Sequence, residues 1–134
     1  MNTKEGDTEL DISRVPEEDV IVYNSSEWTI VIPLTHRSAM YWGKDSYWDT
    51  SWVGGEMWFD QYSKQGNLII IQNKIHPEML YQFHIKSRLF FDKENKAVIF
   101  AEFFTTHPEL REAIKTFLQD DKEQLHTFEA LSLS

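Results

Sequence analysis

The chain of 134 residues contains no cysteine. This absence excludes disulfide bridges, metal sites with thiolate ligands and a thiol nucleophile, and it fits a reducing compartment. Apolar stretches are only a few residues long, such as Leu68 to Ile71. The first residues are acidic where a secretory signal would begin with basic residues. We therefore expect neither passage through a membrane nor secretion.

Basic residues are outnumbered, with 13 lysines and arginines against 22 aspartates and glutamates and a net charge of -9. The excess lies at the two ends. Residues 1–19 hold seven acids and two bases, and residues 120–134 hold four acids and one base, so the span between them is near neutral. A nucleic-acid surface normally needs clustered positive charge, which disfavours nucleic acid as a partner. We interpret the acidic ends as solvated segments.

The length suits one domain with a single core. Residues 1–18 have few apolar groups and no regular period, which predicts an acidic flexible lead-in. We expect a single globular domain over residues 19–119. The acidic C-terminal tail, residues 120–134, is either a frayed helical end that uses Leu125, Phe128 and Leu131, or a disordered segment.

Runs of β-branched and aromatic residues predict five strands. In the fourth run, a period of two puts Leu80, Gln82 and His84 on one face of the sheet. The residues between them face the other way. A meander of neighbouring antiparallel strands is the simplest arrangement of such runs. The predicted strands are residues 20–23, 27–32, 67–72, 79–85 and 88–91.

Two segments carry helix signals. Residues 35–42 predict a short helix that stops at the following glycine. Thr106 and Glu109 have the spacing of a capping box and Pro108 suits a first turn, which predicts a C-terminal helix that begins near Thr106. Residues 100–104 either extend a strand or form a short helix. Together these elements predict an α+β domain: an antiparallel sheet of about five strands, packed by the C-terminal helix and bordered by an aromatic-rich helix or loop segment.

That aromatic-rich segment, residues 41–62, contains four of the five tryptophans and a central pair of glycines. Its rings have three interpretations: core packing, a platform that stacks nucleic-acid bases, or a contact patch for a protein. Core packing accounts for most such rings, but we expect several to stay exposed, where Trp and Tyr serve as binding anchors. The partner-binding candidates are Trp42, Tyr47, Trp48, Trp52 and Trp58.

No phosphate-binding glycine loop, nucleophile elbow or His-Glu-x-x-His helix is present in the sequence. Gln82 and His84 share a strand face, which we favour as the solvated face of an antiparallel sheet. The alternative is a pocket in which His84 is a general base, Gln82 orients the substrate and Asp49 supplies a carboxylate. Asp49 itself is either a carboxylate in apolar surroundings or a turn residue.

The five histidines show no helical or strand spacing that is typical of a metal pair. A site built from His36, Asp49 and His84 requires the fold to bring distant segments together. We predict no metal and no cofactor.

Several separated motifs lie between residues 28 and 95: Pro33, Thr35, Gly43, Trp48, Thr50, residues 62–66, residues 81–84, Ser87, Phe90 and Asp92. Together they resemble a group of small proteins and domains of tailed bacteriophages. That group carries a Tyr-Gly element, a Trp-Cys-Thr element, a Tyr-Ser-Lys-Gln-Gly turn and a Tyr-Gln-Phe-His strand. Asp49 replaces the cysteine of the second element, so any thiolate chemistry of the group would be lost here. The resemblance spans roughly residues 28 to 95.

The resemblance implies a phage protein that works in the host cytoplasm. With the surplus of aromatics and the lack of a catalytic motif, the leading hypothesis is an accessory protein that binds a host or phage protein without catalysis. An inhibitor of host defence or replication machinery is one such protein. An enzyme with a pocket near His84 and Asp49 is the alternative, and a stacking protein for single-stranded nucleic acid is the third hypothesis.

Overall fold

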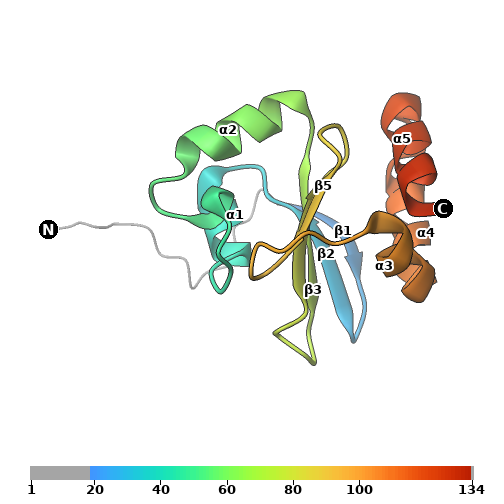
Figure 1. Cartoon of the computed structure of the whole chain (residues 1–134), viewed down its shortest axis with the longest axis horizontal. Coiled ribbons are helices and arrows are strands. Elements are labelled where there is room, and N and C mark those ends of the chain that lie inside the picture. The colour runs from blue at the N-terminus through green and yellow to red at the C-terminus, as the bar shows by residue number, and fades with distance from the viewer. Residues whose placement is uncertain (1–18, 134) are drawn as a thin grey trace, which may run out of the picture.

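Five strands form one antiparallel sheet whose order follows the chain (Figure 1). The computed structural model describes residues 19–133, so the predicted lead-in over residues 1–18 lies outside the described residues. The prediction of an α+β domain built on about five antiparallel strands is confirmed. The strands are β1 (Val20–Asn24), β2 (Trp28–Ile32), β3 (Leu68–Asn73), β4 (Leu80–His84) and β5 (Leu89–Asp92).

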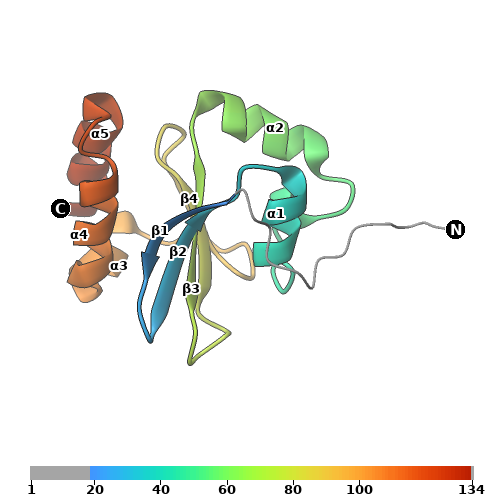
Figure 2. The same cartoon turned by 180° about the vertical axis from the view of Figure 1, so that it is seen from behind.

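Helices cover both faces of this sheet (Figures 1 and 2). On one side lie α1 (His36–Trp42), the short 3-10 helix η1 (Asp49–Ser51) and α2 (Glu56–Gln65). On the other side lie α3 (Phe100–Thr106), α4 (Pro108–Phe117) and α5 (Lys122–Leu133). The interpretation of the Leu80, Gln82 and His84 face as solvated is therefore wrong, because η1 and α2 cover it and all three residues are buried.

The alternation of β4 divides the interior into two parts. Phe83 packs with Phe104 and Phe128 in a large core between the sheet and α3 to α5. Leu80 points the other way and packs with Val31, Ile70 and Trp48 beneath η1. Gln82 lies opposite Ile70 of β3 and Phe91 of β5, so its side chain faces the same side as theirs. The period of two thus places polar Gln82 and His84 inside the smaller layer.

Local chemistry explains the start of the two helices in that layer. The hydroxyl of Thr35 accepts a hydrogen bond from the N–H of Ser38 at 3.1 Å and caps α1. Gly55 precedes α2, and a Cβ at this position would lie only 1.7 Å from the carbonyl oxygen of Asp49. A glycine therefore allows α2 to begin directly against η1.

The predicted capping box at Thr106 and Glu109 is not formed. Thr106 is the last residue of α3, where its Oγ1 donates to the carbonyl of Glu102 at 2.9 Å. Helix α4 begins at Pro108, and its N-cap residue His107 makes no side-chain capping bond. Phe100, Phe103 and Phe104 are buried, so residues 100–104 form a helix rather than a strand. Helix α3 ends before His107, whose φ of -123° and ψ of 69° are not helical, because a proline disfavours helical backbone at the residue that precedes it.

The acidic C-terminal segment is helical in the structure. Phe128 of α5 is fully buried against Phe104 and Phe83, so the helix packs into the main core. The carboxylate of Asp121 accepts from both the backbone N–H and the side-chain amide of Gln124, at 3.2 and 2.8 Å. These hydrogen bonds lower the pKa of Asp121 and cap the first turn of α5. None of the helices within residues 19–133 combines the length and the apolar character that crossing a bilayer requires.

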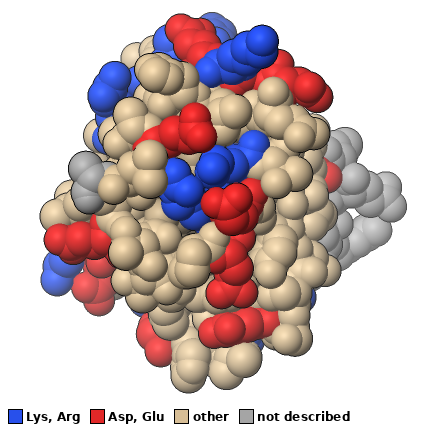
Figure 3. Space-filling view, turned by 90° about the vertical axis from the view of Figure 1, so that its right-hand side faces the viewer, with Lys and Arg blue, Asp and Glu red and all other residues tan. Residues whose placement is uncertain are grey.

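The outer surface of the α3 to α5 layer carries charges of both signs, interspersed across the face (Figure 3). Lys115 lies 3.7 Å from Glu112 and 3.6 Å from Glu129, and Arg111 lies 3.3 Å from Glu112. Ion pairs whose glutamates are exposed to solvent add little stability. This face therefore resembles an ordinary solvated surface.

Candidate functional site

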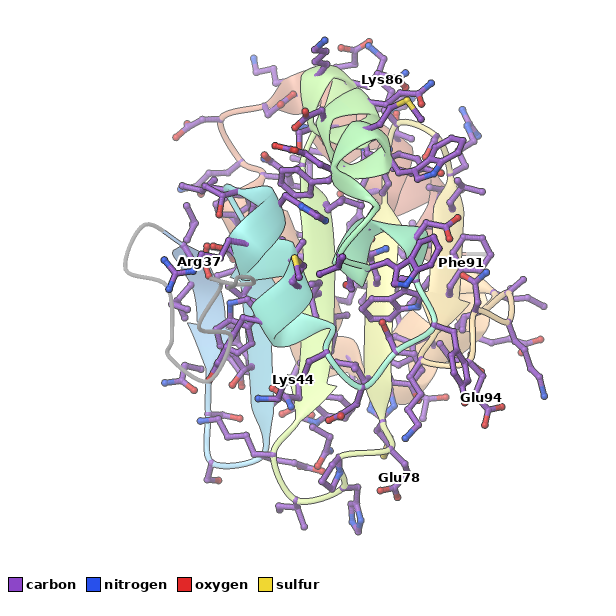
Figure 4. All side chains as sticks on the ribbon, turned by 90° about the vertical axis from the view of Figure 1, so that its left-hand side faces the viewer. Arg37, Lys44, Glu78, Lys86, Phe91 and Glu94 are labelled. Carbon is purple, nitrogen blue, oxygen red and sulfur yellow. The ribbon has the colours of Figure 1, made fainter. Side chains whose placement is uncertain are left out.

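A pocket of about 200 Å³ lies between the sheet and the segment that runs from η1 into α2. Figure 4 looks onto this side, with α1 and α2 in front of the sheet and Phe91 labelled. Phe91 packs against the cluster that contains Trp48, the residue before η1. Alternate residues of adjacent strands build the sheet side of the pocket because they share one face. The strands contribute Leu68, Gln82, His84, Leu89 and Phe91, and the covering segments contribute Trp48, Asp49, Thr50, Trp58 and Tyr62. Asn95, in the turn after β5, also lines it.

Gln82 is the polar centre of this pocket and is only 7% exposed. Its Oε1 accepts a hydrogen bond from the hydroxyl of buried Thr50 at 3.0 Å, which ties η1 to β4. Its side-chain Nε2 makes no hydrogen bond with any residue of the described range 19–133. A buried amide N–H without a partner costs free energy, so this donor is available to a ligand.

His84 occupies both of its ring nitrogens within the fold. Its Nδ1 accepts from the backbone N–H and the hydroxyl of Ser87, at 3.2 and 2.8 Å, and its Nε2 donates to the carbonyl of Tyr62 at 3.0 Å. Burial lowers the pKa of His84 from 6.5, although hydrogen bonds to the backbone of Tyr62 and Gly66 act in the opposite direction. The ring is therefore neutral at pH 7 and connects β4 to the end of α2.

Asp49 is exposed at the first position of the 3-10 helix η1. Of its two interpretations, the structure therefore favours a residue of a surface turn over a carboxylate enclosed by apolar groups. It nevertheless lines the same pocket as Gln82 and His84. The structure thus brings together the three residues of the enzyme hypothesis. A general base needs a ring nitrogen that can take a proton from a substrate, and both nitrogens of His84 already have partners. The arrangement favours binding over acid–base chemistry.

Two of the five partner-binding candidates have interior roles. Trp48 is 3% exposed, and its Nε1 donates to the carbonyl of Asp92 at 2.7 Å. Trp42 is half-buried, and its Nε1 donates to the carboxylate of Asp19 at 2.6 Å. Each indole thereby joins segments that are distant in sequence, and the ring of Trp48 offers no surface to a partner.

The other three candidates are exposed: Tyr47 by 76%, Trp52 by 66% and Trp58 by 43%. Val53 and Met57, which are not among the candidates predicted from the sequence, are 74% and 68% exposed. We call Trp52, Val53, Met57 and Trp58 the apolar patch. Phe59 is the one buried side chain of α2. A prediction of this helix from the sequence would have shown that Met57 and Trp58 face away from the core, but a single buried position gives no helical period from which to predict it.

A metal site is not assembled from the histidines singled out in the sequence. His36 does not line the pocket of Asp49 and His84, and its Nε2 bonds to the carbonyl of Trp52 at 2.8 Å. Among residues 19–133, no group of three His, Asp or Glu side chains converges in a way that could hold a metal ion.

The chain was compared with protein-family models, curated proteins and solved structures. No protein-family model, curated protein or solved structure matches the chain. The phage resemblance stays a prediction from the sequence motifs. The pocket and the apolar patch are accordingly interpreted from their own chemistry.

Proposed function

We propose that this protein acts by non-catalytic binding of a partner protein, and that the apolar patch is its contact surface. The observation that carries the proposal is the exposure of Trp52, Val53, Met57 and Trp58, all within seven residues of sequence and each between 43% and 74% exposed. Scattered exposed apolar residues are ordinary, but a group that includes two tryptophans is typical of a protein interface. Tryptophan is also enriched among the residues that dominate binding energy.

The backbone beneath the patch is well held, which supports a binding role. The N–H of Trp52 donates to the carbonyl of Asp49 at 3.2 Å, and the carbonyl of Trp52 accepts from Gly55 N–H at 2.9 Å. The same carbonyl lies 2.8 Å from Nε2 of His36. A partner therefore meets side chains on an ordered turn, and ordering that turn adds no further entropic cost to binding.

Local charge favours a protein over a nucleic acid as the partner. Residues 44–64, the segment that carries the patch, contain four acids and two bases and so have a net negative charge. One of the two bases, Lys44, lies over the ring of Tyr41, with its Nζ 4.5 Å from the ring centre. Phosphates would be repelled here, whereas a partner with an apolar cavity and a basic rim would be complementary.

The setting of this activity follows from the sequence resemblance alone. On that basis the partner is a host or phage protein, the location is the host cytoplasm, and the effect is inhibition of host defence or replication machinery. The enzyme hypothesis has one observation in its favour, the common pocket of Asp49, Gln82 and His84. Stacking of single-stranded nucleic acid would use the same exposed rings as the apolar patch.

Affinity measurements on patch variants test the proposal. A partner captured from host lysate is purified, and its affinity is measured for the wild type and for Trp52→Ala and Met57→Ala. We expect each variant to weaken binding by about tenfold or more, as for interface anchors. Ile75→Ala is the matched control, because Ile75 is also exposed, by 62%, but lies in the turn between β3 and β4.

Unchanged affinity in both patch variants, with folding intact, would contradict the proposal. Binding of single-stranded DNA that weakens steeply with salt would instead support the stacking hypothesis.

A further inference from the structure

The pocket beneath Trp58 has a chemistry of its own, and the apolar patch does not explain it. We infer that this pocket binds an uncharged planar heterocycle with a lactam edge, meaning a ring N–H next to a ring carbonyl. The inference goes beyond the proposed function, because a small molecule can fill the pocket whether or not the patch holds a protein.

The size and walls of the pocket suit a flat ring. Its volume is about 200 Å³, and a dry cavity of about 150 Å³ in another protein holds one benzene molecule. The rings of Trp48, Trp58, Tyr62 and Phe91 belong to residues that line it. Phe83 also lines it, but its side chain packs in the opposite core, so only its backbone faces the pocket. Aromatic walls favour aromatic ligands through stacked and edge-on contacts.

The floor supplies a hydrogen-bond donor that needs an acceptor. Gln82 is buried, and while Thr50 satisfies one end of its amide, the other end has no partner among residues 19–133. A carbonyl on a ligand would satisfy this N–H. A lactam offers such a carbonyl with an N–H beside it, and this N–H remains free to donate to a second group.

The rim supplies the complementary acceptor. Among the described residues that line the pocket, Asp49 carries the one charge, since His84 is neutral. A ligand N–H can donate to this carboxylate, and hydrogen bonds to charged groups are stronger than those between neutral groups. Because no Lys or Arg lines the pocket in residues 19–133, a phosphate attached to the ligand would find no counter-charge there.

The solvent-exposed residues among those that line the pocket show where its entrance lies. Asp49, Trp58 and Asn95 are solvent-exposed, whereas Gln82 and Thr50 are buried. A ring therefore enters beside Trp58, with its carbonyl toward Gln82 and its N–H within reach of the carboxylate. Trp52 does not line the pocket, so the patch and the pocket can be tested separately.

Ligand titration of the full chain, followed by NMR, tests the inference. The probes are α-pyridone, the simplest aromatic lactam, and N-methyl-α-pyridone, in which the donor is blocked. We expect α-pyridone to shift the side-chain amide signals of Gln82 and the indole N–H signal of Trp48. We expect N-methyl-α-pyridone to bind about tenfold more weakly, because it cannot donate to Asp49.

The variant Asp49→Ala, titrated with the same two pyridones, completes a double-mutant cycle between the protein and the ligand. It should bind both pyridones equally, at the weaker affinity, while its spectrum away from the pocket stays unchanged because Asp49 is an exposed residue. Trp52→Ala should leave both titrations as in the wild type, so loss of protein binding and loss of ligand binding are distinguishable. Equal affinity of the two pyridones for the wild type, shifts outside the pocket, or a preference that persists in Asp49→Ala would each overturn the inference.

Titrations with guanosine and guanosine monophosphate distinguish two classes of ligand that carry a lactam edge, purines and single-ring lactams. Guanosine binding that is weakened by the phosphate identifies a free purine base or nucleoside as the ligand. Binding of α-pyridone without binding of guanosine identifies a single-ring lactam.

Discussion

The imidazole of His84 holds the end of α2 through the carbonyl of Tyr62, with Nε2 3.0 Å from the oxygen. This carbonyl belongs to the last turn of α2, where it also accepts the helical hydrogen bond from the N–H of Gly66 at 3.1 Å. Because Ser87 occupies the other ring nitrogen, a neutral His84 joins β4, the end of α2 and the turn at Ser87.

Folding stability should decrease as pH falls below neutrality. The folded protein holds the pKa of His84 below 6.5, so between that lowered value and 6.5 the unfolded chain binds more protons. The stabilisation is therefore complete above pH 6.5 and is lost progressively as pH falls from there toward the folded-state pKa. Guanidinium unfolding at about pH 7.5 and about pH 5.5 measures the difference.

The variant His84→Gln should lose part of this pH dependence. Burial also lowers the pKa of His107, so the double variant with His107→Gln should have a still smaller slope. A slope in His84→Gln equal to that of the wild type would show that this ring does not titrate as described.

Thr50 and Gln82 should show strong coupling in a double-mutant cycle. Thr50→Val leaves the buried Gln82 amide without its one partner in the described part of the chain, and should cost about 1–3 kcal/mol. Thr50→Val with Gln82→Met removes both polar groups at similar volume, and its stability should be close to that of the wild type. Denaturant unfolding of the four proteins gives the coupling energy. Additive losses would mean that the two side chains do not interact.

Gly66→Ala should destabilise the protein by about 1–3 kcal/mol through the backbone. Gly66 has φ of 159° and ψ of 179°, a conformation that residues with a Cβ rarely adopt. An added Cβ would lie 3.6 Å from Nε2 of His84, an ordinary contact, so a clash is not the cause. Gly54→Ala is the control, with φ outside the positive range and a nearest atom 4.0 Å away. Thermal unfolding should separate the two variants.

Trp48→Ala and Trp52→Ala should differ sharply in stability. Trp48 is buried and donates to the carbonyl of Asp92, so its removal should cost about 3–5 kcal/mol. Trp52 is 66% exposed, and its removal should change stability by no more than about 0.5 kcal/mol. Chemical denaturation measures both values. A large loss in Trp52→Ala would mean that this ring belongs to the fold rather than to a contact surface.

Patterns over a few residues were sufficient to predict the sheet. The alternation in β4 and the β-branched runs depend on neighbours along the chain, and the meander follows because consecutive strands pair. The cap at Thr35 is equally local. The capping box at Thr106 failed because the buried Phe103 and Phe104 extend α3 through that residue.

The pocket, and the difference in burial between the tryptophans, depend on contacts between segments that are distant in the sequence. Thr50 meets Gln82 across 32 positions, and Trp48 meets Asp92 across 44. Helix α2 buries only Phe59, so its sequence has too few core positions to predict a helix. Whether a side chain is buried depends on which other segment of the chain packs over it. The residue type alone does not determine that segment. Composition therefore predicted that some rings would be exposed, while three-dimensional packing selected Trp52 and Trp58 for the surface and Trp48 for the core.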